Sequence, residues 1–166
     1  MPGDPAVAMF RWLSEPALRV VFWARGEAGR LGSEAIEPQH FLLGLLIEDE
    51  GESVRAAASL LGIQTIANPQ PERPFFRRET AGKLRLILEE SAVLGAPKPD
   101  NVDMPVAERA QWALRAAAEH AGIAKVQLLH ILWGLLSDKE SSVGNLLNAH
   151  GVTVEQIEDA IRDKST

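Results

Sequence analysis

The sequence contains no cysteine and no tyrosine, and it has neither an excess of basic residues nor a long apolar run. Without cysteine, disulfides and thiolate chemistry are excluded, and a reducing compartment is permitted. The net charge of −6 argues against a nucleic-acid or anionic-membrane partner, because such binders need a basic face that displaces counterions. The longest apolar stretch, residues 41–47, is far shorter than the roughly 20 residues that span a bilayer.

The N-terminal residues, MPGDP, lack the basic region and the long apolar region of a signal peptide. Together with the missing cysteines and the missing membrane span, this start predicts a cytoplasmic protein. We expect it to have no nucleic-acid partner and no membrane partner.

Recognisable catalytic and metal-binding patterns are also absent from the sequence. No Gly-x-x-x-x-Gly-Lys-Ser/Thr loop is present to cradle nucleotide phosphates. His40 and His130 have no second histidine or carboxylate three or four residues away on their own helices, as a helical zinc site needs. We expect each imidazole instead to bond the link before its helix. The sequence therefore predicts no catalytic residue, no metal and no cofactor, and a protein that is not an enzyme.

One apolar pattern occurs twice in the chain. Residues 40–46 read HFLLGLL and residues 130–136 read HILWGLL, so a histidine leads an almost wholly apolar helix at an offset of 90. Upstream matches keep this offset, whereas downstream matches have an offset of 89. Such a repeat predicts a tandem duplication of a helical unit, forming a pseudo-twofold pair and not a long solenoid. The upstream pairs are Ala17 with Ala107, Arg19 with Arg109, Ala28 with Ala118 and Gly32 with Gly122.

Apolar residues recur at helical spacing through most of the chain. Ser14 is expected to cap the first helix, Pro38 to open the second, and Thr153 to begin a capping box for the last. Because no alternating strand pattern occurs, the predicted fold class is all-α. The expected helices run from about 14 to 31, 38 to 47, 53 to 61, 80 to 94 and 142 to 150, with a final one carrying Ile157 and Ile161.

The second helix of each copy is apolar all round, which is typical of a helix buried on every side. Gly44 and Gly134 each cost roughly 1 kcal/mol relative to alanine in mid-helix, so we expect another helix to cross closely at each. Trp133 takes the position of Leu43 and is expected to be buried. The predicted shared core consists of Leu42, Leu45, Leu46, Leu132, Leu135 and Leu136.

The order of elements in each copy is helix, tight link, histidine-led apolar helix, short Ser-Val helix and Gly-Ile/Val. This order resembles the Clp repeat domain at the N-terminus of Clp/Hsp100 AAA+ unfoldases, and the ClpC-like members more than the ClpB-like ones. The resemblance predicts one domain over residues 1–166, with repeat one at about 10–63, an inserted helix and linker at about 64–101, and repeat two at about 102–162. Since no ATPase module is present, we expect a stand-alone Clp N-domain.

The resemblance implies a non-catalytic module that receives protein substrates and adaptors, in protein quality control or regulated proteolysis. The implied partners are protein substrates, adaptors, or Clp ATPase and peptidase subunits. Two alternatives stay open, a ligand-sensing regulator and an unrecognised enzyme, both unconnected with Clp machinery. Co-purification with a Clp unfoldase or peptidase would separate them from the leading interpretation.

The family's pocket for phosphorylated arginine departs from the family pattern here. ClpC-like repeats commonly place Thr-Glu directly before the histidine, where the carboxylate receives the guanidinium. This sequence has Pro38 and Gln39 in the first copy, and Leu128 and Leu129 in the second. A neutral amide does not pair with a cation, so phosphoarginine binding is not expected.

In the resembled family, ligands bind around the start of each first helix and the link before each histidine. If Met104, Leu128 and Leu129 are exposed together, they form an apolar patch beside a polar, acidic first copy. The alternative is that Leu128 and Leu129 bury into the second core as a hydrophobic staple. The candidate partner-binding residues are Ser14, Glu15 and Gln39 in copy one, and Met104, Pro105, Leu128 and Leu129 in copy two.

Overall fold

The computed structural model describes residues 11–50, 75–99 and 103–164 of the chain. Those residues form seven helices and no β-strand, which confirms the all-α prediction. The helix expected at 53–61 lies outside them. The helices are α2 (Glu15–Arg30), α3 (Pro38–Asp49), α5 (Arg78–Glu90), α6 (Glu108–Ala121), α7 (Leu128–Ser137), α8 (Ser142–Ala149) and α9 (Val154–Lys164).

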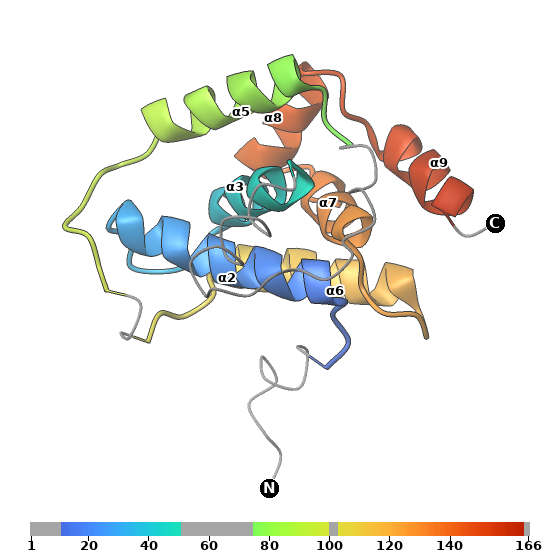
Figure 1. The fold of residues 1–166 in the computed structure, drawn as a ribbon, viewed down its shortest axis with the longest axis horizontal. Coiled ribbons are helices and arrows are strands. Elements are labelled where there is room, and N and C mark those ends of the chain that lie inside the picture. The colour runs from blue at the N-terminus through green and yellow to red at the C-terminus, as the bar shows by residue number, and fades with distance from the viewer. Residues whose placement is uncertain (1–10, 51–74, 100–102, 165–166) are drawn as a thin grey trace, which may run out of the picture.

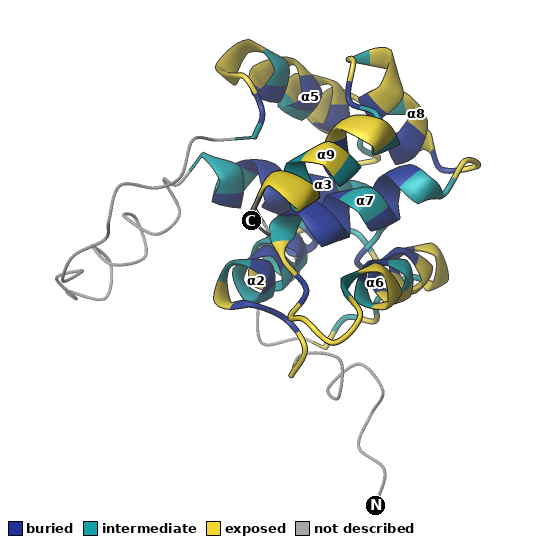
Figure 2. Cartoon of the chain, turned by 90° about the vertical axis from the view of Figure 1, so that its right-hand side faces the viewer, coloured by how far each residue is buried: buried dark blue, intermediate teal, exposed yellow. Residues whose placement is uncertain are grey.

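The helices are arranged in three layers (Figures 1 and 2). The histidine-led helices α3 and α7 form the middle layer, with α2 and α6 on one side and α5 and α8 on the other. The C-terminal helix α9 packs against α7. Because the middle helices are covered on both sides, they carry few polar side chains. The six leucines predicted for the shared core are all buried.

Side-chain caps fix the beginnings of the first and last helices, as the sequence predicted. Ser14 Oγ accepts a hydrogen bond from the Ala17 backbone N–H at 3.2 Å, and Thr153 Oγ1 accepts one from the Gln156 N–H at 3.3 Å. Each oxygen satisfies one of the N–H groups that lack a partner within the helix. Behind the second cap, Ile157 is fully buried.

The inserted helix α5 ends earlier than predicted, at Glu90 instead of near Leu94. The chain beyond it is tied to the end of α2, where the Gly95 N–H donates to the Leu31 carbonyl at 2.9 Å. Ser91 is the C-cap of α5, and the chain has left the helix by Ala92, before it reaches this bond. A Cβ at Gly32, whose φ is +74°, would lie 2.2 Å from the Gly95 carbonyl carbon, and only glycine fits there.

Both predicted glycine crossings are present. A Cβ at Gly44 would lie 2.7 Å from the Val20 carbonyl oxygen of α2. A Cβ at Gly134 would lie 2.2 Å from the Ala113 carbonyl oxygen of α6. The bare glycine backbone therefore lets each middle helix approach its outer helix more closely than any side chain would permit.

These crossings correct the predicted register of the first helices. Gly44 faces Val20 whereas Gly134 faces Ala113, so α2 and α6 correspond at an offset of 93 and not 90. The burial pattern agrees, with Ala17 and Ala24 of α2 matched by Ala110 and Ala117 of α6, all buried. A shift of three residues rotates a helix by only about 60° from a full turn, so sequence periodicity does not separate the two registers.

Two isolated parallel β-bridges join the copies to each other. Leu13, before α2, pairs with Val126, before α7, and Ile36, before α3, pairs with Val106, before α6. The Ser14 N–H donates to the Val126 carbonyl at 2.9 Å. In the second bridge, the Ile36 N–H donates to the Pro105 carbonyl at 2.8 Å. Each bridge therefore connects the start of one copy to the histidine link of the other, as a pseudo-twofold arrangement requires.

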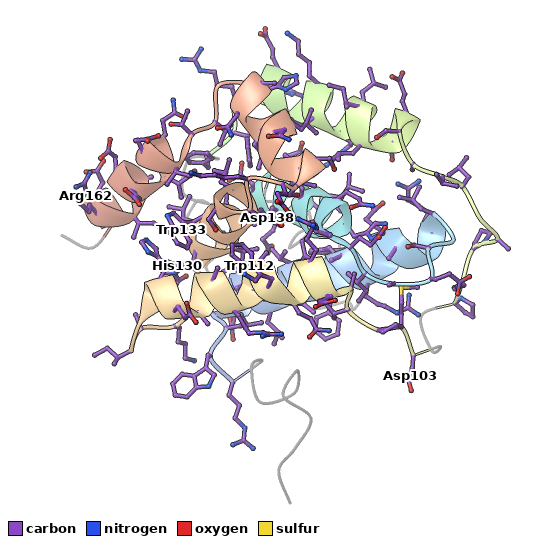
Figure 3. The ribbon with its side chains drawn as sticks, turned by 180° about the vertical axis from the view of Figure 1, so that it is seen from behind. Asp103, Trp112, His130, Trp133, Asp138 and Arg162 are labelled. Carbon is purple, nitrogen blue, oxygen red and sulfur yellow. The ribbon has the colours of Figure 1, made fainter. Side chains whose placement is uncertain are left out.

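Trp133 is half-buried, and the prediction that it would be buried was wrong. Its indole N–H donates to Glu158 Oε1 of α9 at 3.3 Å, and the His120 ring stacks on the indole at a centroid distance of 4.2 Å. Figure 3 shows Trp133 and His130 where α7 lies between α6 and α9. The polar N–H explains the position, because a tryptophan that packs in a core still needs a partner for this group.

Among residues 11–50, 75–99 and 103–164, no helix combines the length and apolar character needed to cross a membrane.

Candidate functional site

The structure brings the candidate residues together across the copies. The Leu13–Val126 bridge sets Ser14 and Glu15 of copy one beside the entry to α7, which begins with Leu128 and Leu129. The Ile36–Val106 bridge sets Met104 and Pro105 of copy two beside the start of α3, which carries Gln39. The candidate residues are therefore grouped across the copies and not within each copy, because the parallel bridges pair the start of one copy with the histidine link of the other.

The candidate residues beside the Leu13–Val126 bridge are less exposed than a binding surface would require. Ser14 is buried and its hydroxyl caps α2, so only Glu15 offers an exposed side chain from copy one. Leu129 is 6% exposed, and Leu128 is half-buried against the core. Leucine burial at this helix entry matches the staple interpretation of the sequence.

The candidate residues beside the Ile36–Val106 bridge likewise form no exposed apolar patch. Met104 is partly buried and packs against the core, and Pro105 is exposed. Met104 and Leu129 lie at different bridges and pack against the core, so the condition for the apolar patch, joint exposure of Met104, Leu128 and Leu129, is not met. The register correction has a further consequence: Ala107 and Glu108 of copy two, and not Met104 and Pro105, correspond to Ser14 and Glu15.

Glu37 directly follows Ile36 of the second bridge, and the sequence reasoning missed it. It is the N-cap of α3, and its Oε2 accepts a hydrogen bond from Gln39 Nε2 at 2.8 Å. A carboxylate at a helix N-terminus is favoured by the helix dipole. The available signal was the acidic residue directly before Pro38, which is a helix-opening residue. The link before His40 is therefore anionic even though Gln39 is neutral.

The two histidines have the structural role predicted for them. His40 Nδ1 accepts the Glu37 backbone N–H at 2.9 Å, and His130 Nδ1 accepts the Gln127 N–H at 2.9 Å. Burial lowers the pKa of His40, an effect that Glu37 and Glu27 only partly oppose. Burial also lowers the pKa of His130, and nearby His120 adds to this. Both rings therefore favour the neutral form that can accept these bonds.

An ion pair ties each outer helix to the end of a middle helix. Arg19 of α2 pairs with the buried Glu48 of α3. Arg109 of α6 pairs with Asp138, which follows α7, at 2.8 Å. Each pair links an outer helix to the C-terminal end of a middle helix and so helps to hold the two helices together. In the part of the chain that the structure describes, no three histidine or acidic side chains are grouped to hold a metal ion.

No protein-family model matches the chain. The chain is 28% identical over 151 residues to the chaperone protein ClpB of Oceanobacillus iheyensis, which covers 89% of this chain and 16% of that protein. It is 27% identical over 151 residues to ClpC/MecB of Bacillus subtilis, a negative regulator of genetic competence, with the same coverage. The chain thus spans about one sixth of the length of these relatives. Its similarity to the ClpB type is as strong as that to the ClpC type.

A solved structure extends the likeness to the fold. The N-terminal domain of the Clp-protease-associated chaperone ClpD from Arabidopsis thaliana superposes with a TM-score of 0.60 at 21% identity. The match covers 95% of this chain and 99% of that domain.

Proposed function

We propose that this chain, which has the fold of the Clp N-terminal domains, is a non-catalytic protein-binding module. In this role it receives protein substrates or adaptors, or docks on Clp ATPase or peptidase subunits, in protein quality control or regulated proteolysis. The observation that carries the proposal is the extent of the likeness. It spans 95% of the chain against a Clp N-terminal domain and 89% against Clp chaperones.

The surface of the molecule supports a protein partner. Several large apolar side chains are exposed in the described residues although the core is well filled, and a protein partner that covered them would remove this apolar surface from water. They come from the outer helices and links and not from the middle layer. These side chains are Trp12, Phe22, Leu86, Ile87, Val93, Leu94, Trp112 and Ile123.

A binding measurement with purified components tests this proposal. Fluorescence anisotropy would follow a labelled polypeptide in a permanently unfolded form as the chain is added, with the same polypeptide in its native form as the control. Affinity purification of the tagged chain, with identification of Clp ATPase or peptidase subunits, tests the docking role. Saturable binding of the unfolded form or recovery of Clp subunits is expected, and failure of both would overturn the proposal.

A further inference from the structure

A cavity of about 460 Å³ lies between the N-terminal half of α3, the C-terminal end of α5 and the start of α8. Its apolar walls come from all three helices and from the end of α2, and polar groups from the link before His40 complete it. This volume falls in the range of protein sites that take a large side chain or a small ligand. The apolar lining includes Leu31, Leu43, Ile87, Leu88, Val143 and Leu146.

One rim of this cavity is formed by a backbone segment that is firmly held. The segment after α5 is fixed to the end of α2 by the Gly95 N–H to Leu31 carbonyl bond and by a 2.8 Å bond from the Lys98 N–H to the Gly29 carbonyl. Val93, which lines the cavity, is nevertheless 93% exposed. A side chain that stays in water on an anchored backbone loses little further entropy when a partner covers it.

The charge of the cavity has one sign. Glu37 is its one carboxylate, and no lysine or arginine is among the described residues that line it. The nearby cations have partners, since Arg30 pairs with Glu27 and Glu89, and Lys98 pairs with Glu34. Among the described residues no cation pairs with Glu37, whose carboxylate accepts from two neutral donors, the Gln39 amide and the His40 backbone N–H of the capping box. Burial lowers the pKa of the His40 ring, so this ring favours its neutral form and does not offset the charge of Glu37.

We propose that this cavity receives an apolar side chain from an extended segment of a partner protein, with a neighbouring lysine or arginine of that segment paired to Glu37. The anchored segment and α5 supply the apolar walls, and the unneutralised carboxylate selects a cation beside the apolar side chain. The inference deepens the proposed function and rests on it, since it names the kind of segment that the module recognises.

Three blocked peptides of equal length test this inference by anisotropy against the whole chain. Each has a labelled Gly-Ser frame, with a centre of Leu-Lys-Leu, Leu-Glu-Leu or Ser-Lys-Ser. The Leu-Lys-Leu peptide is expected to bind saturably, the Leu-Glu-Leu peptide more weakly, and the Ser-Lys-Ser peptide not measurably. Equal binding of all three would overturn the inference.

Neighbouring residues of α5 provide a matched pair of variants. Ile87 lines the cavity and is 36% exposed, whereas Leu86 is 57% exposed and does not line it. Ile87→Lys is expected to weaken Leu-Lys-Leu binding at least about tenfold, because it places a cation at the mouth, and Leu86→Lys to leave it unchanged. Circular dichroism would establish that both variants keep the helical content of the parent.

A separate variant tests the role of the Glu37 carboxylate. Glu37→Gln keeps an acceptor at the start of α3 and is expected to weaken Leu-Lys-Leu binding about two- to fivefold and to remove its salt dependence. If Ile87→Lys and Glu37→Gln both bind this peptide as the parent does, the cavity is not the site. Unfolded polypeptide that still binds in that case would leave the proposed function standing and the inference alone overturned.

Discussion

The same side-chain contact opens both middle helices. A neutral imidazole, His40 in α3 and His130 in α7, accepts the backbone N–H of the residue three positions earlier. Protonation would replace this acceptor with a second donor, and burial makes the charge costly as well. The two contacts thus make the stability of the molecule depend on pH.

We predict that the free energy of unfolding falls as the pH is lowered from about 7.5 to 5.5. Burial lowers the folded-state pKa of His40 and of His130, so the unfolded chain binds more protons just below the ordinary histidine pKa of about 6.5. Stability is therefore fully present above this pH and is lost on acidification below it. Urea unfolding at a series of pH values measures the slope.

A double variant provides the control for this pH dependence. His40→Gln with His130→Gln keeps a side-chain acceptor at the third helical position, as in a capping box, but does not titrate. The variant is expected to show a much flatter profile over the same interval. A slope equal to that of the parent would assign the effect to other groups.

Glycines on different helices are predicted to respond to alanine with opposite signs. Gly134→Ala places a methyl group 2.2 Å from the Ala113 carbonyl oxygen, and overpacking of this kind costs about 1–3 kcal/mol. Gly82, on the exposed side of α5, has nothing within 4 Å of an added Cβ. Gly82→Ala should therefore stabilise, by up to about 1 kcal/mol from helix propensity. Thermal unfolding of the two variants would contradict this if both shifted the same way.

Two residues show where sequence reasoning about the site reached its limit. Leu129 has the chemistry of an exposed contact and of a core residue alike, and only the packing of α7 decides for the core. Glu37 lies before the motif that the family resemblance drew attention to, and its place in the anionic link follows from its position as the cap of α3. The sequence identifies these side chains, but it does not show how far each one is exposed or which residues surround it.

At the scale of the elements, hydrophobic periodicity predicted where most helices lie. It did not predict which residues of α2 correspond to which residues of α6. The helix ends follow from local chemistry, such as the Ser14 cap, so they are visible in the sequence. The offset of 93 between α2 and α6 depends on which residues face the middle-helix glycines. That choice is made by tertiary contact, and a helix shifted by three residues presents nearly the same apolar face. The early end of α5 likewise depends on a bond to a distant element.

Truncation of the middle layer is predicted to be far more costly than truncation of an outer helix. Leu135 in α7 is 2% exposed, so Leu135→Ala should destabilise by about 2–5 kcal/mol through lost burial and the cavity left behind. Leu86→Ala in α5 removes the same atoms from an exposed position and should change stability by less than about 0.5 kcal/mol. Chemical denaturation compares the two, and similar losses would mean that the layers are not as described.

At the scale of the whole molecule, the bridges and the leucines of α3 and α7 make the copies depend on each other. Both bridges in the described residues pair one residue of copy one with one residue of copy two. The core is likewise a single cluster of buried side chains from both copies. We propose that the whole chain is one domain, because neither copy completes its own links or core.

This arrangement predicts a single cooperative unfolding transition. Tryptophan fluorescence and far-ultraviolet circular dichroism should give coincident urea curves, because Trp23 belongs to copy one and Trp133 to copy two. A separate chain of residues 103–166 should show little helix and no sigmoidal melting. Two resolved transitions, or a stably folded fragment, would contradict the prediction.

The exchange of bridge partners also bears on how such a chain arises. A lone ancestral copy would carry both halves of a bridge, a segment before its first helix and a link before its histidine, but would be unable to join them to each other. Two identical copies satisfy both pairings at once, as in a symmetric dimer with the same surface on each subunit. Joining the two copies in one polypeptide removes the concentration dependence of that assembly. It also allows the two copies to diverge in sequence. The link before α3 can then become anionic, while the start of α7 becomes part of the core through its leucines.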